Sequence, residues 1–280
     1  MTIPSQPQIF MNGKKIDSDR IVHSDFAEDQ IFVFESLRSY KGVIFRLGEH
    51  LNRLFDSART IGLKIKKTRS ELKKELASSL TAHPAQDAFL RLGVDRENSY
   101  ILVLDRKRPT WIYEKGVAIK TVVIRRNLTH SELTEPKTSA FFNNVLAAME
   151  KQDSDAYDVI FLDSLGYVAE GTVWNIFMVK TKQLFTPQVG ILNGVTRRFV
   201  IECAEQENLP VFETYLTRHD FWNADEAFLT NTSGEIVPIR SLDGRAIGKE
   251  IPGRVTNQLM VRFHQELDKE LNLDSHSRTL

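Results

Sequence analysis

The chain contains little of what marks a secreted or membrane-bound protein. Its 280 residues include a single cysteine, Cys203, so an intrachain disulfide is impossible. No apolar run approaches the ~20 residues that a membrane-spanning helix needs, and the opening MTIPSQPQIF lacks the basic start and apolar stretch of a secretory signal. These absences favour a cytoplasmic protein without a membrane partner. Cys203 lies on an apolar stripe with Phe199 and Val200, so we expect it to be a small buried residue.

An excess of charge and a set of metal ligands are missing as well. Basic and acidic residues balance at 37 each, so no overall field points to a nucleic-acid partner. The seven histidines form no close-spaced ligand set, and we therefore expect no metal. Glycine-rich nucleotide loops and the common hydrolase motifs are also absent. Hydrophobic residues nevertheless make up 41% of the chain, enough for an ordinary globular core.

Both α and β patterns recur along the chain without an internal repeat. Asn12-Gly13, between two short apolar runs, favours a tight β-hairpin because both residues tolerate positive φ angles. Leu51, Leu54 and Ala58 recur at helical spacing and predict a helix over 51–62. Further helices are expected at about 70–80, at 142–149 with an apolar stripe of Phe142, Val145, Leu146 and Met149, at 197–206 and from Pro252. Strands are expected at 31–37, 43–45, 89–94, 100–104, 117–124, 158–162, 167–169, 175–179, 183–186, around 211 and at 226–229.

A polar segment divides this pattern into two parts. Residues 125–136 contain little that could be buried, which makes them the best linker candidate. We therefore expect two domains of mixed α and β structure, residues 1–124 and residues 137–280. A cleft between two such halves is a favoured place for a cofactor.

Polar residues stand in otherwise apolar surroundings in several segments spread over most of the chain. These are FVFESLRSY at 32–40, HLNRLFDSA at 50–58, Lys137, EGTVWNIF at 170–177, GVTR at 194–197, ADEAFLTNTSGEI at 224–236 and PGRVT at 252–256. In order and spacing they resemble the class IV aminotransferases, which have a two-domain, mixed α and β fold of fold type IV, the D-amino acid aminotransferase-like fold. Any single segment is weak evidence, whereas the ordered set covers about residues 9–263.

The resemblance implies a pyridoxal-phosphate enzyme with Lys137 as its catalytic lysine. Lys137 follows Pro136 at the start of an apolar helix pattern, whereas many other lysines lie in charged runs such as 64–67. Such a lysine holds the cofactor as a Schiff base and then moves the proton between the substrate α-carbon and the cofactor. Glu170 matches the glutamate that keeps the cofactor's ring nitrogen protonated, because a carboxylate stabilises that charge. Its alternative interpretation is a solvated loop glutamate.

Four further residues match the cofactor's phosphate contacts by the same resemblance. Arg53 matches the phosphate arginine, and Thr232 a hydroxyl contact. Val195 and Thr196, after Gly194, would offer backbone N–H groups and a hydroxyl at the start of a helix, which favours a dianion. An ordinary surface arginine and a simple helix cap are the structural alternatives for Arg53 and Thr196.

The resemblance to the family also implies substrate contacts at four positions. Arg38 and Arg91 lie where branched-chain members of the family line the active site, and either could face a carboxylate or form a structural ion pair. Ser233 and Gly234 belong to a turn that is expected to hold the substrate α-carboxylate. The reaction expected is transamination between an amino acid, of which a branched-chain one is the best guess, and a 2-oxo acid such as 2-oxoglutarate, by a homodimer.

Several residues depart from the family pattern and leave other functions open. The segment after Lys137 has Ala140, Phe141 and Phe142 where a polar residue is usual, and Trp174 replaces a smaller or polar residue. D-amino acid or amine transamination and aminodeoxychorismate lyase chemistry are therefore alternatives within the family. A homologue that binds the cofactor or another ligand without turnover is the alternative of a different class.

Overall fold

The computed structural model describes residues 6–16, 31–126, 136–139, 142–152 and 154–277 of the 280-residue chain. It divides into two compact units. Unit 1 comprises Met1–Lys107, Pro136–Ala140 and Leu271–Leu280, and unit 2 comprises Arg108–Glu135 and Phe141–Glu270. The strand expected at 117–124 thus belongs to unit 2, whereas Lys137 belongs to unit 1. Residues 127–135 of the predicted linker lie outside the described residues.

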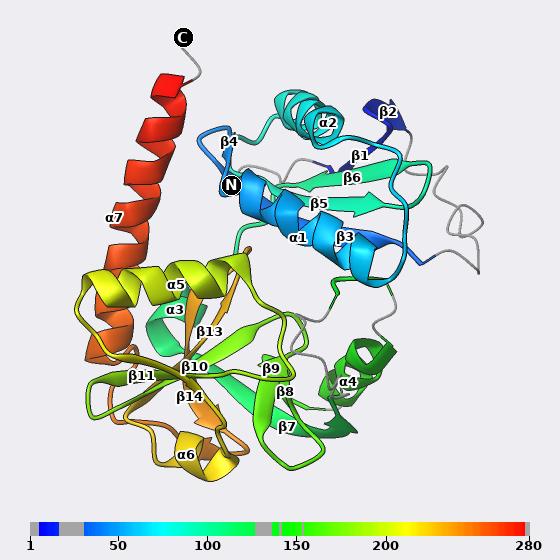
Figure 1. Ribbon diagram of the computed structural model, residues 1–280. Helices are drawn as coiled ribbons and strands as arrows, with labels where there is room; N and C mark the ends of the chain where they lie inside the picture. The colour runs from blue at the N-terminus through cyan, green and yellow to red at the C-terminus, as the bar shows by residue number, and fades with distance from the viewer. Residues whose placement is uncertain (1–5, 17–30, 127–135, 140–141, 153, 278–280) are drawn as a thin grey trace. The chain divides into compact units, whose positions relative to one another are not determined.

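Unit 1 is built on a six-stranded antiparallel sheet with two helices (Figure 1). The strand order is β2-β1-β6-β5-β3-β4. The Asn12-Gly13 turn expected from the sequence joins the first hairpin, and both residues have positive φ. The elements are β1 (Gln8–Met11), β2 (Lys14–Ile16), β3 (Val33–Tyr40), β4 (Val43–Ile44), α1 (Leu47–Thr60), α2 (Arg69–Thr81), β5 (Phe89–Val94) and β6 (Ser99–Leu104).

The central strand β3 places two different sets of side chains on its two faces. Because side chains alternate along a strand, Val33, Glu35 and Leu37 share one face, and all three are fully buried. This face lies against α1, whose Leu51 and Leu54 belong to the same core cluster as Val33 and Leu37. Glu35 therefore lies in an apolar layer, where an ionised carboxylate requires partners.

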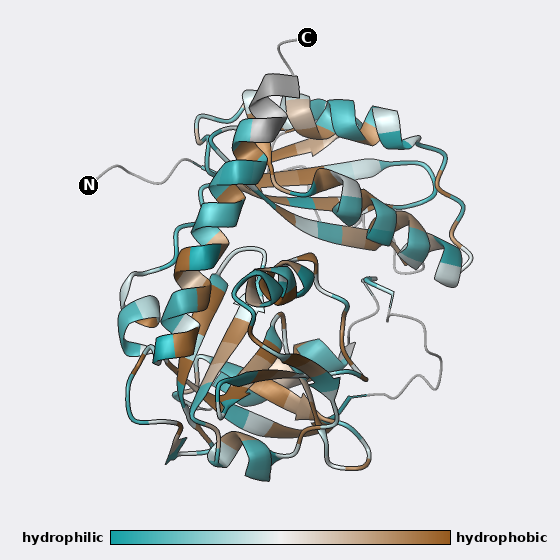
Figure 2. Cartoon of the chain, turned by 60° about the vertical axis from the view of Figure 1, so that its left-hand side comes forward, coloured by the Kyte–Doolittle hydropathy of each residue, from teal (hydrophilic) through white to brown (hydrophobic). Residues whose placement is uncertain are grey.

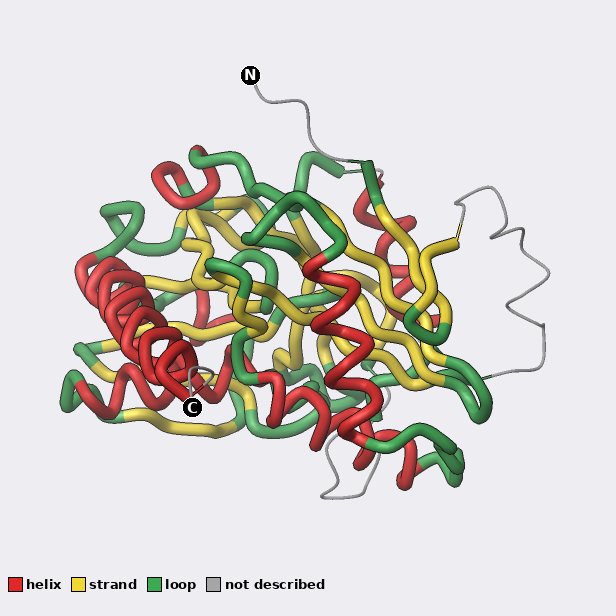
Figure 3. Tube along the Cα trace, turned by 90° about the horizontal axis from the view of Figure 1, so that it is seen from above, coloured by secondary structure: helices red, strands yellow, loops and turns green. Residues whose placement is uncertain are grey.

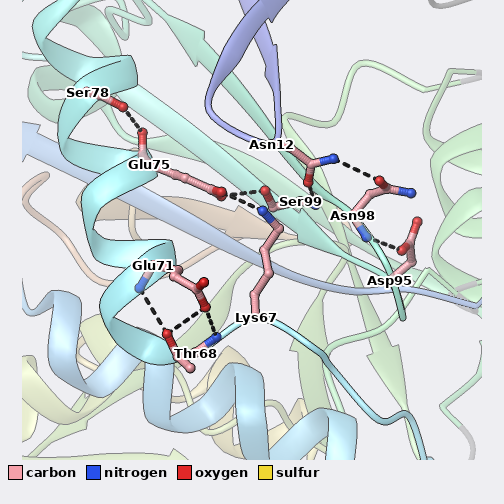
Figure 4. Close-up of polar contacts among 9 residues, drawn as sticks. All are labelled: Asn12, Lys67, Thr68, Glu71, Glu75, Ser78, Asp95, Asn98 and Ser99. Atoms are coloured by element: carbon pink, nitrogen blue, oxygen red, sulfur yellow. Dashed lines mark hydrogen bonds and ion pairs between the residues drawn. The ribbon is translucent and has the colours of Figure 1, made fainter.

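Polar contacts fix the start of α2 and its link to the sheet (Figure 4). The Thr68 hydroxyl accepts a hydrogen bond from the Glu71 N–H, and the Glu71 carboxylate accepts one from the Thr68 N–H, which is a capping box. One turn further on, Glu75 accepts hydrogen bonds from the Lys67 amine and the Ser99 hydroxyl, both at 2.5 Å. These contacts tie α2 to β6 beside the first hairpin.

Unit 2 contains a nine-stranded mixed sheet. The strand order is β12-β11-β10-β13-β14-β7-β8-β9, and β15 pairs with β14 off this path. Three neighbouring pairs, β11–β12, β14–β7 and β7–β8, are parallel. The strands are β7 (Val117–Arg125), β8 (Asp158–Leu162), β9 (Val168–Gly171), β10 (Asn175–Lys180), β11 (Gln183–Pro187), β12 (Val211–Thr214), β13 (Glu226–Asn231), β14 (Glu235–Leu242) and β15 (Arg245–Ala246). The described helices are α3 (Trp111–Lys115), α4 (Phe142–Gln152), α5 (Val195–Gln206), α6 (Arg218–Trp222) and α7 (Arg254–Ser277), of which α7 belongs to unit 2 as far as Glu270.

Most residues of the larger core cluster of unit 2 lie in its strands, which carry much of the brown colour in Figure 2. In α5, Cys203 is fully buried as the sequence predicts. The apolar stripe expected to bury α4 does not do so, because Val145 and Met149 are 45% and 58% exposed while Ala147 is buried. Apolar spacing identified the helix but not the face that packs.

The long helix α7 explains two of the family-like segments in structural terms. It begins at Arg254, two residues after the predicted Pro252, and is continuous in Figure 3. The buried Glu226 carboxylate accepts hydrogen bonds from the N–H groups of Val255 and Thr256 at 2.9 and 2.7 Å. Glu226 therefore pairs two of the N–H donors that the first turn of a helix leaves unpaired. Within the described ranges, no helix is long and apolar enough to cross a membrane.

Candidate active-site residues

Lys137 is held in unit 1 by bonds to its main chain. Its N–H donates to the Ser57 hydroxyl of α1 at 3.0 Å, and its carbonyl accepts from the Phe34 N–H of β3 at 3.0 Å. Two residues on, the Ser139 N–H donates to the Phe32 carbonyl at 2.9 Å. The segment thus extends the edge of β3, and the Lys137 amine lies 4.6 Å from the centre of the Phe34 ring. A lysine with its backbone anchored on both sides can place its amine reproducibly.

Arg53 is oriented by a buried carboxylate on the helix-facing side of β3. Its Nε and Nη2 donate to the two oxygens of Glu35 at 2.7 and 2.6 Å, and His50 Nδ1 lies 2.8 Å from the same carboxylate. Burial raises the pKa of Glu35, but the charge and hydrogen bonds of Arg53, with those of His50, outweigh it and hold that pKa at about 2. Glu35 is therefore ionised at neutral pH and can only accept, so His50 Nδ1 carries a proton.

Burial also lowers the pKa of His50, which its contact with Glu35 only partly offsets. His50 is therefore neutral near pH 7 and donates to Glu35 without adding a second charge. Arg53 remains the charged partner of this buried group. Ser57, one turn after Arg53, is the residue that binds the Lys137 backbone, so α1 connects the two predicted cofactor residues of unit 1.

The predicted substrate residues Arg38 and Arg91 lie on the opposite face of the same sheet. Arg91 pairs with Ser36 across β5 and β3, which puts it on the face that also carries Phe34 and Arg38. Its guanidinium lies 4.6 Å from the Phe34 ring centre, and that of Arg38 lies 4.8 Å from the Tyr40 ring. Phe34 thus contacts both Arg91 and the amine of Lys137. Among the described residues, Arg106 also reaches this face of unit 1, because its guanidinium lies 5.2 Å from the centre of the Phe89 ring.

Glu170 is a buried carboxylate in unit 2 that is surrounded by donors. Its Oε1 accepts from Arg126 Nη2 at 2.8 Å, and its Oε2 accepts from Asn175 Nδ2 at 3.0 Å and from the Leu192 N–H at 2.9 Å. Only 5% of Glu170 is exposed. The alternative of a solvated loop glutamate is therefore wrong. A carboxylate held in this way can stabilise a positive charge on a ligand.

The start of α5 lies next to this carboxylate and offers unpaired donors. Gly194 is the N-cap and gives no side-chain cap, so the first N–H groups, including those of Val195 and Thr196, have no capping partner among the described residues. A Cβ on Gly194 would lie 2.2 Å from Asn175 Oδ1, which requires glycine here. Asn175 thus contacts both Glu170 and the residue before the helix. Asn175 therefore links Glu170 to the start of α5, where the predicted cofactor residues Val195 and Thr196 lie.

Two threonines close to Asn175 and the start of α5 have hydroxyl groups that suit a cofactor carrying a phosphate. Thr230 pairs with Asn175 across β13 and β10, and its hydroxyl is buried without a hydrogen-bond partner in the described part of the chain. Thr196, 7% exposed, places a hydroxyl in the first turn of α5. A buried orphan hydroxyl, an uncapped helix start and a buried carboxylate together match the polar groups of pyridoxal phosphate. The residues present therefore fit the cofactor that the sequence predicts.

The turn after β13 contains Thr232, Ser233 and Gly234. The N–H groups of Ser233 and Gly234 donate to Asn231 Oδ1 at 3.0 and 2.7 Å, and Asn231 Nδ2 donates to the Val173 carbonyl at 3.1 Å. The two amides expected to bind a substrate carboxylate are thus already paired. Thr232 remains half-buried beside them.

Several partners of the candidate residues are not predicted from the sequence. Arg126 falls in the expected polar linker, and Asn175 and Glu35 stand in family-like segments without an expected role of their own. A charged or amide residue in a buried strand pattern is the signal that could have identified Glu35 and Asn175. Ala140 and Phe141 and the side chain of Phe142, which depart from the family pattern, lie outside what the structure describes. In the described segments no cluster of His, Cys, Asp or Glu could hold a metal ion.

Comparison with known proteins agrees with this arrangement. A protein of Methanocaldococcus jannaschii, provisionally named a branched-chain-amino-acid aminotransferase, is 35% identical over 91% of this chain and 95% of its own. The D-alanine aminotransferase of Bacillus licheniformis is 30% identical over 85% and 88%. Among solved structures, the T.th. branched-chain amino acid aminotransferase with pyridoxamine 5'-phosphate has a TM-score of 0.83 and 25% identity over 92% and 93%.

The family model of amino-transferase class IV matches residues 32–242, three quarters of the chain. The fold class expected from the sequence, mixed α and β of fold type IV, is confirmed by the likeness to solved aminotransferases. The order of the motifs, the fold and the relatives all agree. The chain therefore belongs to the aminotransferase class IV family.

Proposed function

We propose that the protein is a pyridoxal-phosphate-dependent transaminase in which Lys137 binds the cofactor and a branched-chain amino acid is the amino donor. The observation that carries the proposal is the anchored position of Lys137, whose main chain is bonded to α1 and β3 while its amine reaches the Phe34 ring. Family membership supports the reaction class, and the relatives named as branched-chain aminotransferases support the substrate class.

When bound, pyridoxal phosphate supplies an aldehyde that accepts the amino group and a ring that draws electrons from the substrate carbon. The protein's residues bind and orient it. The amine of Lys137 would bind the aldehyde and would be the group that moves the proton at the substrate carbon. Glu170 would stabilise a positive charge on the ring nitrogen, and Arg126 and Asn175 fix the position of its carboxylate.

Each unit contributes its own candidates for the phosphate contacts in this proposal. In unit 1, Arg53, oriented by Glu35, supplies a cation. In unit 2, Val195, Thr196 and Thr232 supply donors, and the first turn of α5 has no side-chain cap among the described residues. Arg38 and Arg91 are the candidates in unit 1 for binding a substrate carboxylate.

The first test is the absorption spectrum of the purified protein after incubation with pyridoxal phosphate. Wild type should show the violet-region band of a lysine-bound cofactor, and Lys137→Ala should lose it. Lys120→Ala, a change at an exposed lysine of β7, is the matched control and should keep the band. If Lys137→Ala keeps the band, another lysine binds the cofactor and the proposal is wrong at its centre.

Titration of the same protein with amino donors identifies the substrate class. L-leucine should bleach the violet band and 2-oxoglutarate should restore it. Bleaching by D-alanine instead would favour D-amino acid transamination; D-alanine is chosen because the B. licheniformis relative is named a D-alanine aminotransferase. Release of pyruvate from aminodeoxychorismate without any 2-oxo acid would indicate a lyase. A band that no amine donor bleaches would indicate a homologue that binds the cofactor without turnover.

Assembly and cellular location remain predictions from the sequence. We expect a homodimer, whose mass by light scattering would be twice the 32.1 kDa of the chain. We expect cytoplasmic enzyme activity, which fractionation of cells that express the chain would detect. A monomer with full turnover would contradict the first expectation.

A further inference from the structure

Arg108, at the start of unit 2, is an arginine without a carboxylate partner among the described residues. Its Nη2 donates to the Ser233 hydroxyl at 2.9 Å and its Nη1 to the Tyr157 hydroxyl at 3.3 Å. Its guanidinium lies 5.5 Å from the centre of the Trp174 ring. Its half-buried side chain therefore contacts two neutral hydroxyls and an aromatic ring.

Two other buried or half-buried arginines of this unit are paired with acids. Arg126 donates to Glu170 and Arg197 donates to Glu213, at 2.8 and 2.6 Å. Arg108 forms no ion pair with any described residue, and its buried Nε has no acceptor among them. A partly desolvated cation of this kind gains more from an anion than a surface arginine would. The charge of Arg108 therefore has no counter-charge among the described residues.

The residues that contact Arg108 are connected to the predicted cofactor residues Thr232 and Glu170 of the same unit. Ser233 lies in the turn beside Thr232, and Asn231 of that turn donates to the Val173 carbonyl. Trp174, under the guanidinium, precedes Asn175, which donates to Glu170. All of these residues belong to unit 2.

The turn itself has few donors to offer an anion. The Ser233 and Gly234 amides are taken by Asn231, and a Cβ at Gly234 would lie 2.2 Å from the Trp174 ring, so the turn is packed closely against that ring. A guanidinium has five N–H donors, and the two bonds of Arg108 use one on each Nη atom. Each Nη atom therefore keeps a second N–H for an acceptor.

We propose that Arg108 binds a carboxylate of the amino acid or 2-oxo acid, so that the enzyme selects carboxylate-bearing substrates over plain amines. Trp174 and Tyr157 position the guanidinium, and Ser233 aligns its Nη2. Trp174, a departure from the family pattern, thereby acquires a role as the platform for this arginine. The inference rests on the proposed transaminase function and names a specificity-determining residue for it.

The test measures binding of carboxylates that cannot react, to the wild-type holoenzyme and to Arg108→Met and Arg108→Lys. The probes are 4-methylpentanoate and glutarate, with 4-methylpentanamide as the uncharged counterpart, followed by the shift of the cofactor's visible band and by calorimetry. We expect Arg108→Met to weaken carboxylate binding about 10- to 100-fold, in line with the loss of a charge-assisted hydrogen bond. Arg108→Lys should recover part of the loss, and amide binding should change little.

Arg245→Met is the matched control, because Arg245 also stacks on a tryptophan, Trp222, at 4.0 Å but is exposed. It should bind both carboxylates as the wild type does. Weakened binding of both probes in Arg108→Met would assign Arg108 to the carboxylate that all substrates share; weakening for glutarate alone would assign it to a second carboxylate. Unchanged binding of both probes would overturn the proposal.

The outcome can be separated from failure of the proposed function. A wild type that forms no violet band shows that the transaminase function itself is wrong. A wild type and an Arg108→Met variant that share the band and the same melting temperature, but also the same carboxylate affinity, refute only the role of Arg108. Turnover gives a second measurement: kcat/KM for L-leucine should fall in Arg108→Met, and that for 3-methylbutylamine should not.

Discussion

Each unit contains an ion pair between a buried carboxylate and an arginine, and the residue proposed to contact the cofactor is the arginine in unit 1 and the carboxylate in unit 2. In unit 1 the buried carboxylate of Glu35 anchors Arg53, and the arginine is the group proposed to bind the cofactor. In unit 2 Arg126 anchors Glu170, and the carboxylate is the proposed cofactor contact. Each ion pair thus contains one residue that we propose as a cofactor contact and one that orients it. In both units the partner of the proposed cofactor residue is a buried or half-buried charge that orients it.

The largest effect should come from removing the anchor in unit 1. Glu35→Gln leaves Arg53 half-buried without its counter-charge, and we expect the free energy of unfolding to fall by about 3–5 kcal/mol. Urea unfolding of the variant beside Glu97→Gln measures this, because the Lys66–Glu97 pair is exposed and should contribute about 0–1 kcal/mol. Equal losses in the two variants would show that Glu35 is not an anchor.

Replacing Glu170, the proposed cofactor contact of unit 2, should lower kcat strongly and the free energy of unfolding only moderately. Glu170→Gln cannot hold a positive charge on the ring nitrogen, and we expect kcat to fall about 100-fold or more. Stability should fall by only about 1–3 kcal/mol, since Arg126 keeps its bond to Asn144 and its contact with the Phe161 ring. Single-turnover kinetics with L-leucine at saturating cofactor tests this, and a kcat near that of the wild type would exclude the assigned role.

The free energy of unfolding should fall at acidic pH because of Glu35 and His50. The pKa of Glu35 is about 2 in the fold against an ordinary value of 4.5, so its contribution is present above pH 4.5 and is lost as the pH falls towards 2. It amounts to on the order of 3 kcal/mol. Burial lowers the pKa of His50 as well, so protonation of the unfolded chain below pH 6.5 already reduces stability.

Melting temperatures from pH 8 to pH 3 would reveal both effects. The decline should begin near pH 6.5 and steepen below 4.5, and it should be shallower in His50→Gln, whose unfolded chain lacks the histidine proton. A wild-type profile that stays flat down to about pH 4 would show that neither residue is buried as described.

The sequence predicted those parts of the fold that depend on local chemistry. Asn12-Gly13 indicated its hairpin because few other residues adopt positive φ, and the spacing of Leu51 and Leu54 indicated α1. Strand β14 is not predicted from the sequence, because it contains Pro238, and proline normally argues against a strand within a sheet. Here Pro238 is buried and pairs with Phe228.

The candidate site was predictable only where a motif carried it. Lys137 and Glu170 stood in recognisable segments, whereas Arg126 and Arg108 lie in polar stretches that resemble ordinary surface. Nothing local in those stretches shows that a strand end will bring Arg126 to Glu170, or that an aromatic platform will lie under Arg108. Long-range partners of this kind are set by strand pairing, which a single sequence does not reveal.

The main-chain attachment of Lys137 has a consequence for how the protein can change over evolution. Its position depends on one carbonyl and one N–H, which every residue except proline provides, together with the Ser57 hydroxyl. The side chain at position 137 can therefore change without loss of these bonds, whereas Ser139, whose hydroxyl accepts a hydrogen bond from the Phe32 N–H at 3.1 Å, holds the segment through its side chain. Substitutions at the two positions thus remove different things: an amine at position 137 and a structural bond at position 139.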